Sequence, residues 1–517
     1  MEKSDIMLPE VASYLANQKV LVTGVTGFVG LALVEKLLRT VPDINTIYVL
    51  IRAKRGKSME DRLNEIKENA IFETLINKEK ASALSKLVAV EGNIDADQIG
   101  LSEQDLQTVI SNVNYVFHCA ATLDFEASLK TTVEINLLGT RRIVELCKKM
   151  QNLKTLVHVS SAYTNANRQS ADEIIYPPPE DVNKVVELVR TLSGTQLEEV
   201  TPSLLKNHPN TYTFTKALAE HEVANSFQNF PSCIIRPSMI VGAWKEPVPG
   251  WTNSKNGPQG FIMGAAMGVV RRLPVGKHLV YDYIPVDVVV NTMIVAAVYT
   301  VSQKNQLTET PIFQCTSSTH KPFRWANVEH LLSDLLHKYP LMQAVWYPHL
   351  KLLPSITHFR VSAFIFHMIP AYIFDTISRV SGVRPKLVRL HTAVNQSLDR
   401  LEPFIFQEWM FDNSKSLRLH HSLAPADKEV YGLDVASLQW EPFFEDMAKG
   451  VRRYLHKEKD STLDRARNKD NLLMVANLML QVALFALFWF IIKCVFGVSA
   501  GQAALVLPFL YVLFSIL

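Results

Sequence analysis

The sequence has little cysteine, and its cysteines are scattered. There are five in 517 residues, and none forms a CxxC pair or stands at the spacing of Cys and His zinc ligands. An odd, dispersed set argues against a disulfide framework and against a structural zinc site. We therefore expect no metal, and a chain that works in a reducing, cytosol-facing compartment.

Strong charge of one sign is also missing. The formal net charge is only +3, so no broad basic field points to a nucleic-acid partner. Residues 1–18 lack the apolar run and the small-residue cleavage site of a secretory signal. With 48% hydrophobic residues, the chain can bury a large core, and its length suits two or three domains.

The first half of the chain alternates short β-rich runs with helical stretches. This alternation predicts an α/β fold with a doubly wound parallel sheet and helices on both faces. The expected strands are residues 19–23, 45–51, 87–90, 114–118, 155–159 and 233–235. Beyond about residue 247 the pattern becomes irregular, and from 352 to about 460 it is mostly helical. We expect a catalytic domain over 1–350, whose substrate part is about 240–350, and a helical domain over 351–460.

A glycine-rich turn follows the first expected strand. The segment Thr23-Gly24-Val25-Thr26-Gly27-Phe28-Val29-Gly30 has the spacing GxxGxxG between a strand and a helix. In a Rossmann-type fold Gly24 permits the tight turn, Gly27 lets the backbone approach a pyrophosphate, and Gly30 allows close helix packing. The helix N-terminus adds free N–H groups and a positive dipole end. The alternative is a glycine-rich turn that binds nothing.

The second expected strand runs directly into basic residues. Arg52 follows it, with Lys54 and Arg55 close behind. An NAD enzyme usually has an acidic residue here, whereas a guanidinium suits the 2′-phosphate of NADPH. NADPH is therefore favoured over NADH, and a solvated basic loop is the alternative.

Further cofactor contacts are expected where other strands end. Asn93 and Ile94 follow the third strand, where a polar side chain can contact adenine. Ala120 and Ala121 follow the fourth strand and are small enough to let the cofactor pass close. His118, just before them, is expected to be an ordinary packed histidine.

Tyr212 and Lys216 form a YxxxK motif between the fifth and sixth strands. The i, i+4 spacing places both side chains on one helix face. A neighbouring ammonium is expected to lower the pKa of the phenol, which then exchanges a proton with a carbonyl oxygen. Ser161, preferred to Ser160, ends the fifth strand and can hydrogen-bond the substrate oxygen.

Asn136 lies in the middle of an expected helix, where Asn is a poor helix former. It bends the helix or holds a proton-relay water, or else it faces solvent. The residue types alone leave both interpretations open.

Together, TGVTGFVG, VSSAY and YTFTK resemble the extended short-chain dehydrogenase/reductases. Longer segments narrow the resemblance to alcohol-forming fatty acyl-CoA reductases: Tyr176–Pro179, Asn210–Glu220, Ile235–Ser238, Trp244–Trp251 and Val286–Asn291. The segment WKEPVPGW at 244–251 is the most specific. The similarity covers nearly the whole chain, including a helical C-terminal domain around 355–455.

The resemblance implies site residues and a reaction. Tyr212, Lys216, Ser161 and Asn136 would be catalytic, and Pro237 and Ser238 would join the cofactor contacts. Asn93 stands where many related enzymes carry Asp. The implied reaction is the NADPH-dependent reduction of long-chain fatty acyl-CoA to a primary alcohol, through an aldehyde and with release of CoA. Such an alcohol is a precursor of wax or ether lipids.

The C-terminus is rich in apolar residues without charge. Residues 471–492 would span ~33 Å as a helix, enough for the hydrocarbon core. Lys493 interrupts, and 494–517 is a possible second membrane segment. Arg465, Arg467 and Lys469 favour a cytosolic catalytic domain, and the peroxisomal and endoplasmic reticulum membranes both suit such an anchor. Residues 361–377 are expected to be core or the wall of an acyl tunnel, with interfacial membrane contact as the alternative.

Two other functions fit part of this pattern. A membrane-bound hydroxysteroid dehydrogenase shares the fold and the YxxxK motif, but does not need WKEPVPGW or a large helical C-terminal domain. A lipid-binding scaffold without activity would not need Tyr212, Lys216 and the glycine set. The oligomeric state and the preferred acyl chain are left open.

Overall fold

The structure is a computed structural model that describes residues 7–53, 56–77, 81–382 and 384–516. It divides into two compact units, each made of three chain segments. The first unit contains 1–253, 280–323 and 408–439, and the second contains 254–279, 324–407 and 440–517.

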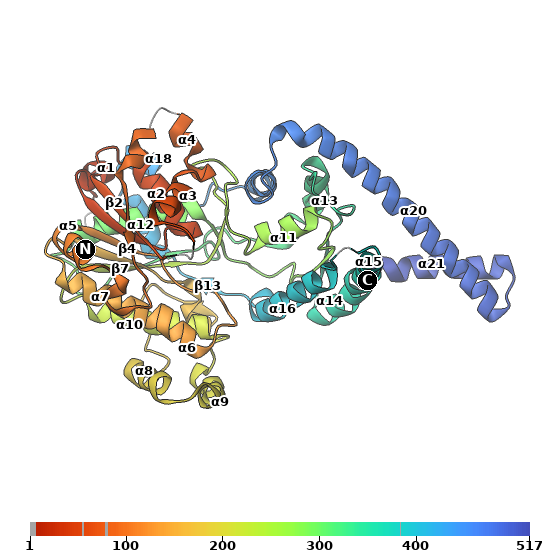
Figure 1. Cartoon of the computed structure of the whole chain (residues 1–517), viewed down its shortest axis with the longest axis horizontal. Helices are drawn as coiled ribbons and strands as arrows, with labels where there is room; N and C mark the ends of the chain where they lie inside the picture. The colour runs from red at the N-terminus through yellow and green to blue at the C-terminus, as the bar shows by residue number, and fades with distance from the viewer. Residues whose placement is uncertain (1–6, 54–55, 78–80, 383, 517) are drawn as a thin grey trace. The chain divides into compact units, whose positions relative to one another are not determined.

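A seven-stranded parallel sheet forms the centre of the first unit (Figure 1). Its strands, in spatial order, are β11 (Ile312–Cys315), β7 (Ser232–Pro237), β5 (Thr155–Val159), β4 (Tyr115–His118), β1 (Lys19–Thr23), β2 (Thr46–Ile51) and β3 (Leu87–Glu91). The predicted Rossmann-type sheet is therefore confirmed. Strand β11 is an addition that the sequence pattern did not single out.

Helices cover both faces of this sheet. On one face α5 (Glu103–Asn112), α7 (Gly139–Lys149) and α10 (Thr211–Asn225) share an apolar core with alternate strand residues such as Leu21, Val116 and Leu156. On the other, α2 (Phe28–Thr40) packs against α12 (Val286–Ser302). In Figure 1 α2 lies above the strands, and α7 and α10 lie below them. Strand order reverses between β1 and β4, where α/β sheets open a crevice for ligands.

The remaining helices of the first unit lie around this core. Two of them, α8 (Val182–Thr191) and α9 (Gly194–Leu205), pack apolar side chains against α10 and the helical segment 129–138. The others are α1 (Val11–Leu15), α3 (Met59–Lys67), α4 (Glu73–Asn77), α6 (Leu129–Thr132), α17 (Ser414–His421) and α18 (Pro425–Val430). Strand pairs β8 (Met239–Val241) with β10 (Tyr283–Pro285) and β6 (Ser170–Ala171) with β13 (Met410–Phe411) complete the unit.

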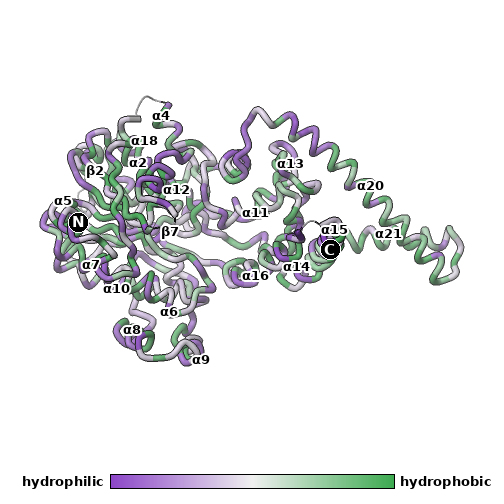
Figure 2. The backbone as a smooth tube through the Cα atoms, viewed as in Figure 1, coloured by the Kyte–Doolittle hydropathy of each residue, from purple (hydrophilic) through white to green (hydrophobic). Residues whose placement is uncertain are grey.

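The second unit is mainly helical. Its helices are α11 (Pro258–Ala266), α13 (Glu329–Lys338), α14 (Ile356–Ala363), α15 (Ile369–Val380), α16 (Leu387–Ile405), α19 (Trp440–Gly450), α20 (Leu463–Phe496) and α21 (Ala500–Ile516). A short parallel pair, β9 (Arg272–Pro274) and β12 (Lys351–Leu353), lies among them. Figure 2 shows that α20 turns from a polar start to a long apolar stretch that continues in α21.

A buried ion pair ties α10 to the sheet. Arg236 of β7 forms two hydrogen bonds with Glu220 of α10, at 2.9 and 2.7 Å, and both side chains are almost fully buried. Arg236 also donates to the backbone oxygens of Asp172 and Ile174. Ser160 completes the group, since its hydroxyl donates to Glu220 at 2.5 Å. The pair therefore fixes the helix that carries Tyr212 and Lys216.

Replacing Arg236 by Gln leaves the Glu220 carboxylate buried and unpaired. We expect the free energy of unfolding to fall by about 3–5 kcal/mol, as for other broken buried pairs. Arg141→Gln is the matched control, because Arg141 bonds Glu222 at 3.0 and 2.8 Å nearer the surface. The control should cost less than about 1 kcal/mol. Denaturant unfolding of both variants in detergent measures the difference, and equal losses would contradict this account.

Candidate active site

The turn after β1 requires glycine at two positions. Gly24 has φ +73°, and a Cβ there would lie 2.8 Å from the backbone nitrogen of Ala120. A Cβ on Gly30 would lie 2.4 Å from the backbone oxygen of Gly24. Gly24 therefore lets the β1 and β4 loops approach, and Gly30 lets α2 pack on the turn.

The start of α2 is open to an outside anion. Gly27 is the N-cap and, within the described residues, no side chain caps the helix. The first backbone N–H groups, on Phe28, Val29 and Gly30, have no acceptor within their own helix. Thr26 and Gly27 are exposed beside them. A bare helix start after a strand and a glycine turn fits the pyrophosphate of a dinucleotide.

The other predicted cofactor residues follow the carboxyl ends of parallel strands, which meet at one edge of the sheet. Arg52 is exposed directly after β2, whereas Lys54 and Arg55 lie outside the described residues. The backbone N–H of Asn93 bonds Ile99 O at 2.7 Å, and Ile94 is buried. The remaining four follow β4 or end β7: Ala120, Ala121, Pro237 and Ser238.

Tyr212, Lys216 and Ser161 come together at the same edge. Tyr212 and Lys216 lie one turn apart on α10, which begins at Asn210, whose side chain accepts the Thr213 N–H at 2.9 Å. Ser161 follows β5, and its side chain lies close enough to the phenol of Tyr212 to lower the pKa of that group. Ser160 bonds Glu220 instead, so Ser161 is the serine beside the phenol.

The pKa of Tyr212 does not follow the sequence-based expectation. Burial raises the pKa of the phenol to about 12, and the nearby Ser161 side chain offsets only part of this rise. The structure therefore does not show the expected lowering of the Tyr212 pKa by Lys216. The ammonium is engaged elsewhere, and desolvation of the phenolate is the larger effect. At neutral pH Tyr212 holds its proton and is ready to donate it.

Lys216 is held by two acceptors from β5. Its ammonium donates to the backbone oxygen of Val159 at 2.7 Å and lies 3.4 Å from Nε2 of His158. Burial lowers the pKa of Lys216 to about 8, while the nearby Glu220 carboxylate opposes this shift. Lys216 thus stays mostly cationic at neutral pH, but loses its charge at mildly alkaline pH.

His118 and His158 form a neutral pair behind Lys216. Their ring centroids are 5.3 Å apart, and burial and Lys216 hold both pKa values far below the usual range, that of His118 at about 3. Nδ1 of His118 lies 2.8 Å from the Thr23 hydroxyl, and Nε2 lies 3.2 Å from the Thr140 hydroxyl. His118 is packed, as expected, but it also links the glycine turn to α7. Sequence reasoning missed His158, which only its position at the end of β5 could have indicated.

Asn136 is buried, so the solvent-facing alternative is wrong. It lies in a π-helical turn, Val133–Leu138, just before α7. Its side chain accepts the Thr122 N–H at 2.9 Å and donates to the Thr215 hydroxyl at 3.3 Å. Asn136 therefore connects the loop after β4 with the helix that carries Tyr212.

Ion pairs and ring packing join the WKEPVPGW segment to α2, the helix that follows the glycine turn. The carboxylate of Asp287 accepts the backbone N–H groups of Trp244, Lys245 and Glu246 at 2.8–3.1 Å. Glu246 in turn forms ion pairs with Lys36 and Arg39 of α2. At the other end, Trp251 packs on Phe28 with ring centroids 5.4 Å apart. Asp287 therefore holds the backbone of this segment in place. The sequence alone had identified it only as part of a motif.

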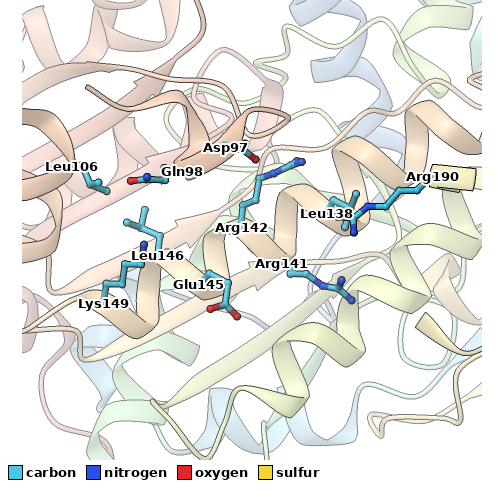
Figure 3. A pocket seen from close by; sticks show the side chains of 10 residues that line it. All are labelled: Asp97, Gln98, Leu106, Leu138, Arg141, Arg142, Glu145, Leu146, Lys149 and Arg190. Atoms are coloured by element: carbon cyan, nitrogen blue, oxygen red, sulfur yellow. The ribbon is translucent and has the colours of Figure 1, made fainter. Parts of the chain in front are cut away.

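A separate cavity lies beside α7, and its lining residue Arg142 donates to the backbone oxygen of Ile94 at 3.1 Å. It has a volume of about 260 Å³ and shares no residue with the predicted site (Figure 3). Its lining is Asp97, Gln98, Leu106, Leu138, Arg141, Arg142, Glu145, Leu146, Lys149 and Arg190. We assign it no role in the chemistry.

Two family descriptions match the chain. Residues 22–293 match an NAD-binding domain described as "Male sterility protein", and residues 366–458 match a second domain, Sterile, with the same description. The first match covers more than half of the chain. It supports a nicotinamide dinucleotide as the cofactor, in agreement with the glycine turn and the open start of α2.

Whole-length relatives carry the name of an enzyme. The chain is 50% identical to "Putative fatty acyl-CoA reductase CG8306" of Drosophila melanogaster, over 98% of this chain and 99% of that protein. It is 34% identical to "Fatty acyl-CoA reductase 1" of Xenopus laevis, with 93% and 92% covered, and 33% identical to the Homo sapiens protein of that name, with 94% and 93% covered.

A solved structure agrees with the fold. It is the terminal R domain from the myxalamid PKS-NRPS biosynthetic pathway, with a TM-score of 0.56, 18% identity, and coverage of 86% of this chain and 91% of that one. At this identity the likeness supports the fold alone. The relatives and the family match together show that the chain belongs to the fatty acyl-CoA reductases, an oxidoreductase family with a Rossmann-type fold.

Proposed function

We propose that this protein reduces long-chain fatty acyl-CoA to a primary alcohol with NADPH, releasing CoA and passing through an aldehyde. The proposal is supported by the placement of Tyr212 and Lys216 one turn apart on α10, by the effect of Ser161 on the phenol, and by the uncapped start of α2 at the carboxyl edge of the same sheet, in a chain of this family. A proton donor thus stands at the edge where a nicotinamide cofactor would be held.

When bound, the reduced nicotinamide supplies a hydride to the carbonyl carbon. The protein's part is to hold and protonate the oxygen. Tyr212 donates its phenolic proton to the oxygen, and Ser161 hydrogen-bonds that oxygen as charge develops on it. The hemithioacetal then loses CoA as the thiol, which leaves the aldehyde. A second cycle at the same residues reduces the aldehyde to the alcohol.

No covalent thioester to the protein is needed in this scheme. Cys119, which interacts electrostatically with Lys216, follows β4, and burial raises the pKa of its thiol to about 12. At neutral pH it is almost entirely in the thiol form, which is a poor nucleophile. This favours direct attack on the thioester over acyl transfer to cysteine.

Arg52 supports NADPH as the cofactor. It is exposed one residue beyond β2, where the 2′ position of the adenosine ribose lies in Rossmann-type folds. Asn136 would act as a positioning residue, because it connects the β4 loop to α10. Asn93, Ile94, Ala120, Ala121, Pro237 and Ser238 would complete the cofactor contacts.

The C-terminal helices support a membrane anchor. Residues Asp460–Phe496 are long and apolar enough to cross a membrane, and none of their most apolar window is buried. We infer that 471–492 spans the bilayer and that α21 is a second segment, with the catalytic unit on the cytosolic side of a peroxisomal or endoplasmic reticulum membrane. Such an anchor suits a long-chain substrate and a product, a wax or ether-lipid precursor, that partitions into lipid.

Two features of the domain organisation also remain predictions. We take α8 and α9 to cover the acyl site, because they pack on the helix that carries Tyr212. The functional division is drawn at 1–350 for the reductase domain and 351–460 for the helical domain.

Tyr212→Phe removes the proton donor and leaves the ring. Detergent-solubilised protein with NADPH and a C16 or C18 acyl-CoA should form alcohol with two NADPH consumed per product. The variant should lose at least ~100-fold in rate, within the range for general acid catalysis. Chromatography of alcohol and aldehyde, with NADPH absorbance, measures this. NADPH binding without any lipid product would favour the scaffold reading instead.

Arg52→Gln removes the charge proposed to bind the 2′-phosphate. Loss of such a charge-assisted contact, worth about 1.5–3 kcal/mol, should raise KM for NADPH ~10–100-fold and leave KM for NADH unchanged. Lys148→Gln, an exposed change on α7, is the control and should alter neither constant. Equal effects on both cofactors would exclude recognition of the phosphate.

The pKa of Lys216 predicts a pH limit. Because burial lowers it to about 8, the ammonium is present below that pH and is lost as pH rises through it. Tyr212, at about 12, stays protonated over the same range. The family resemblance gives the Lys216 ammonium the role of holding the nicotinamide ribose, so we expect kcat/KM to fall above about pH 8. In Lys216→Arg the charge persists, so the remaining activity should show no such fall; an unchanged fall would assign it to another group.

A further inference from the structure

Helices α14 and α15 expose an unusual row of apolar side chains. They form one helical run, joined by the π-helical turn Phe364–Met368. The exposed members are Val361, Phe364, Ile369, Tyr372, Ile373, Phe374, Ile377 and Val380, each between 42% and 85% exposed. Soluble proteins rarely expose so many large apolar side chains together. Such a patch marks a site that contacts another molecule or a membrane.

The other side of the same run is packed into the second unit. Phe359, Ala363 and Ala371 are almost completely buried. His367 is buried as well, and its Nε2 accepts the backbone N–H of Arg271 at 3.0 Å. Asp375 accepts the backbone N–H groups of 386–388 at 2.9–3.0 Å, which caps the start of α16.

The buried polar contacts of His367 and Asp375 indicate whether this helical run crosses a membrane or lies on its surface. Residues Ile356–Val380 are long and apolar enough to cross. A spanning helix, however, would have lipid on most of its circumference, whereas this run has a buried stripe at four-residue spacing that packs on protein: Phe359, Ala363, His367, Ala371 and Asp375. That is the pattern of a helix that lies in the membrane interface.

Basic side chains gather at the end of this face. Between residues 379 and 389 the sequence has four basic residues and no acidic one. These are Arg379, Arg384, Lys386 and Arg389, and all four are exposed at the end of α15 and the start of α16. Apolar side chains beside a basic group match the acyl region and the negative headgroups of an anionic lipid surface.

The face also borders the C-terminal hairpin. Phe366 packs against Phe514 of α21 with ring centroids 6.2 Å apart, and His358 lies 3.1 Å from the backbone oxygen of Ile516. The end of α21 therefore meets the α14–α15 run within the second unit. If α21 returns through the bilayer to this side, the run lies at the membrane surface; this step rests on the anchor proposed above.

We propose that α14–α16 form an interfacial membrane contact, with the apolar row inserted among the lipid chains and the four basic side chains on anionic phospholipid headgroups. A second copy of the chain is the other possible occupant. A symmetric contact of this kind would bring two such basic clusters toward each other, which like-charge repulsion disfavours.

The test uses the full chain in vesicles, with a fluorescent probe on single cysteines. Cys494→Ala removes the exposed native thiol. An environment-sensitive nitrobenzoxadiazole probe is then placed by Ile373→Cys on the apolar row, by Leu484→Cys in α20, or by Ser437→Cys on the exposed surface of the first unit. Lipids carrying a doxyl group report contact with the bilayer by quenching, in phosphatidylcholine vesicles with and without phosphatidylserine.

We expect quenching at 373 and 484 but not at 437, and stronger quenching at 373 when phosphatidylserine is present. Replacing Arg379, Arg384, Lys386 and Arg389 by Gln should abolish that difference. Quenching at 484 without quenching at 373 would overturn the interfacial contact and leave the anchor intact. A blue-shifted but unquenched probe at 373 would show a protein cover, such as a second copy. No quenching at 484 would overturn the anchor itself.

Equal quenching at 373 in both lipids would overturn the role of the basic side chains. Retained reductase activity in the labelled variants confirms that they are folded, since none of these positions belongs to the proposed active site.

Discussion

The parallel register of the central sheet is the constraint on which the site depends. Because β1, β2, β3, β4, β5 and β7 all run in one direction, their carboxyl ends reach the same edge. Residues separated by more than two hundred positions, from Gly24 to Pro237, are gathered there by the backbone hydrogen bonding of the parallel sheet. The helices are then fixed against this edge by buried polar contacts, which include the Arg236–Glu220 pair.

Burial sets the protonation states at this edge more than local charge does. Tyr212, Lys216, His118 and His158 are all removed from water, and in each case desolvation is the main cause of the pKa shift. The phenol keeps its proton, the histidines stay neutral, and the lysine is held close to the point of losing its charge. A bound cofactor and substrate would therefore meet a site in which Tyr212 holds the proton to be given.

The segment that made the sequence distinctive has a structural explanation. WKEPVPGW does not contribute one of the proposed catalytic side chains. Instead Asp287 fixes its backbone, Glu246 pairs with α2, and Trp251 packs on Phe28, so the segment supports the helix that starts at the cofactor turn. A motif can thus be specific to a family because it holds a binding element in place.

The sequence by itself determined the sheet and the C-terminal apolar segments, because these depend on local periodicity. It also determined the glycine turn, because the backbone there adopts a conformation that favours glycine. The sequence also predicted the placement of Tyr212 and Lys216 on one helix and of Ser161 after β5, since their spacing and strand positions are short-range properties. Only the tertiary structure decided that Ser160 bonds Glu220, that Asn136 is buried, that the pKa of Tyr212 rises, and that one side of residues 356–380 is packed while the other is exposed. These depend on neighbours distant in the chain and on the loss of water around each group, which no local pattern encodes.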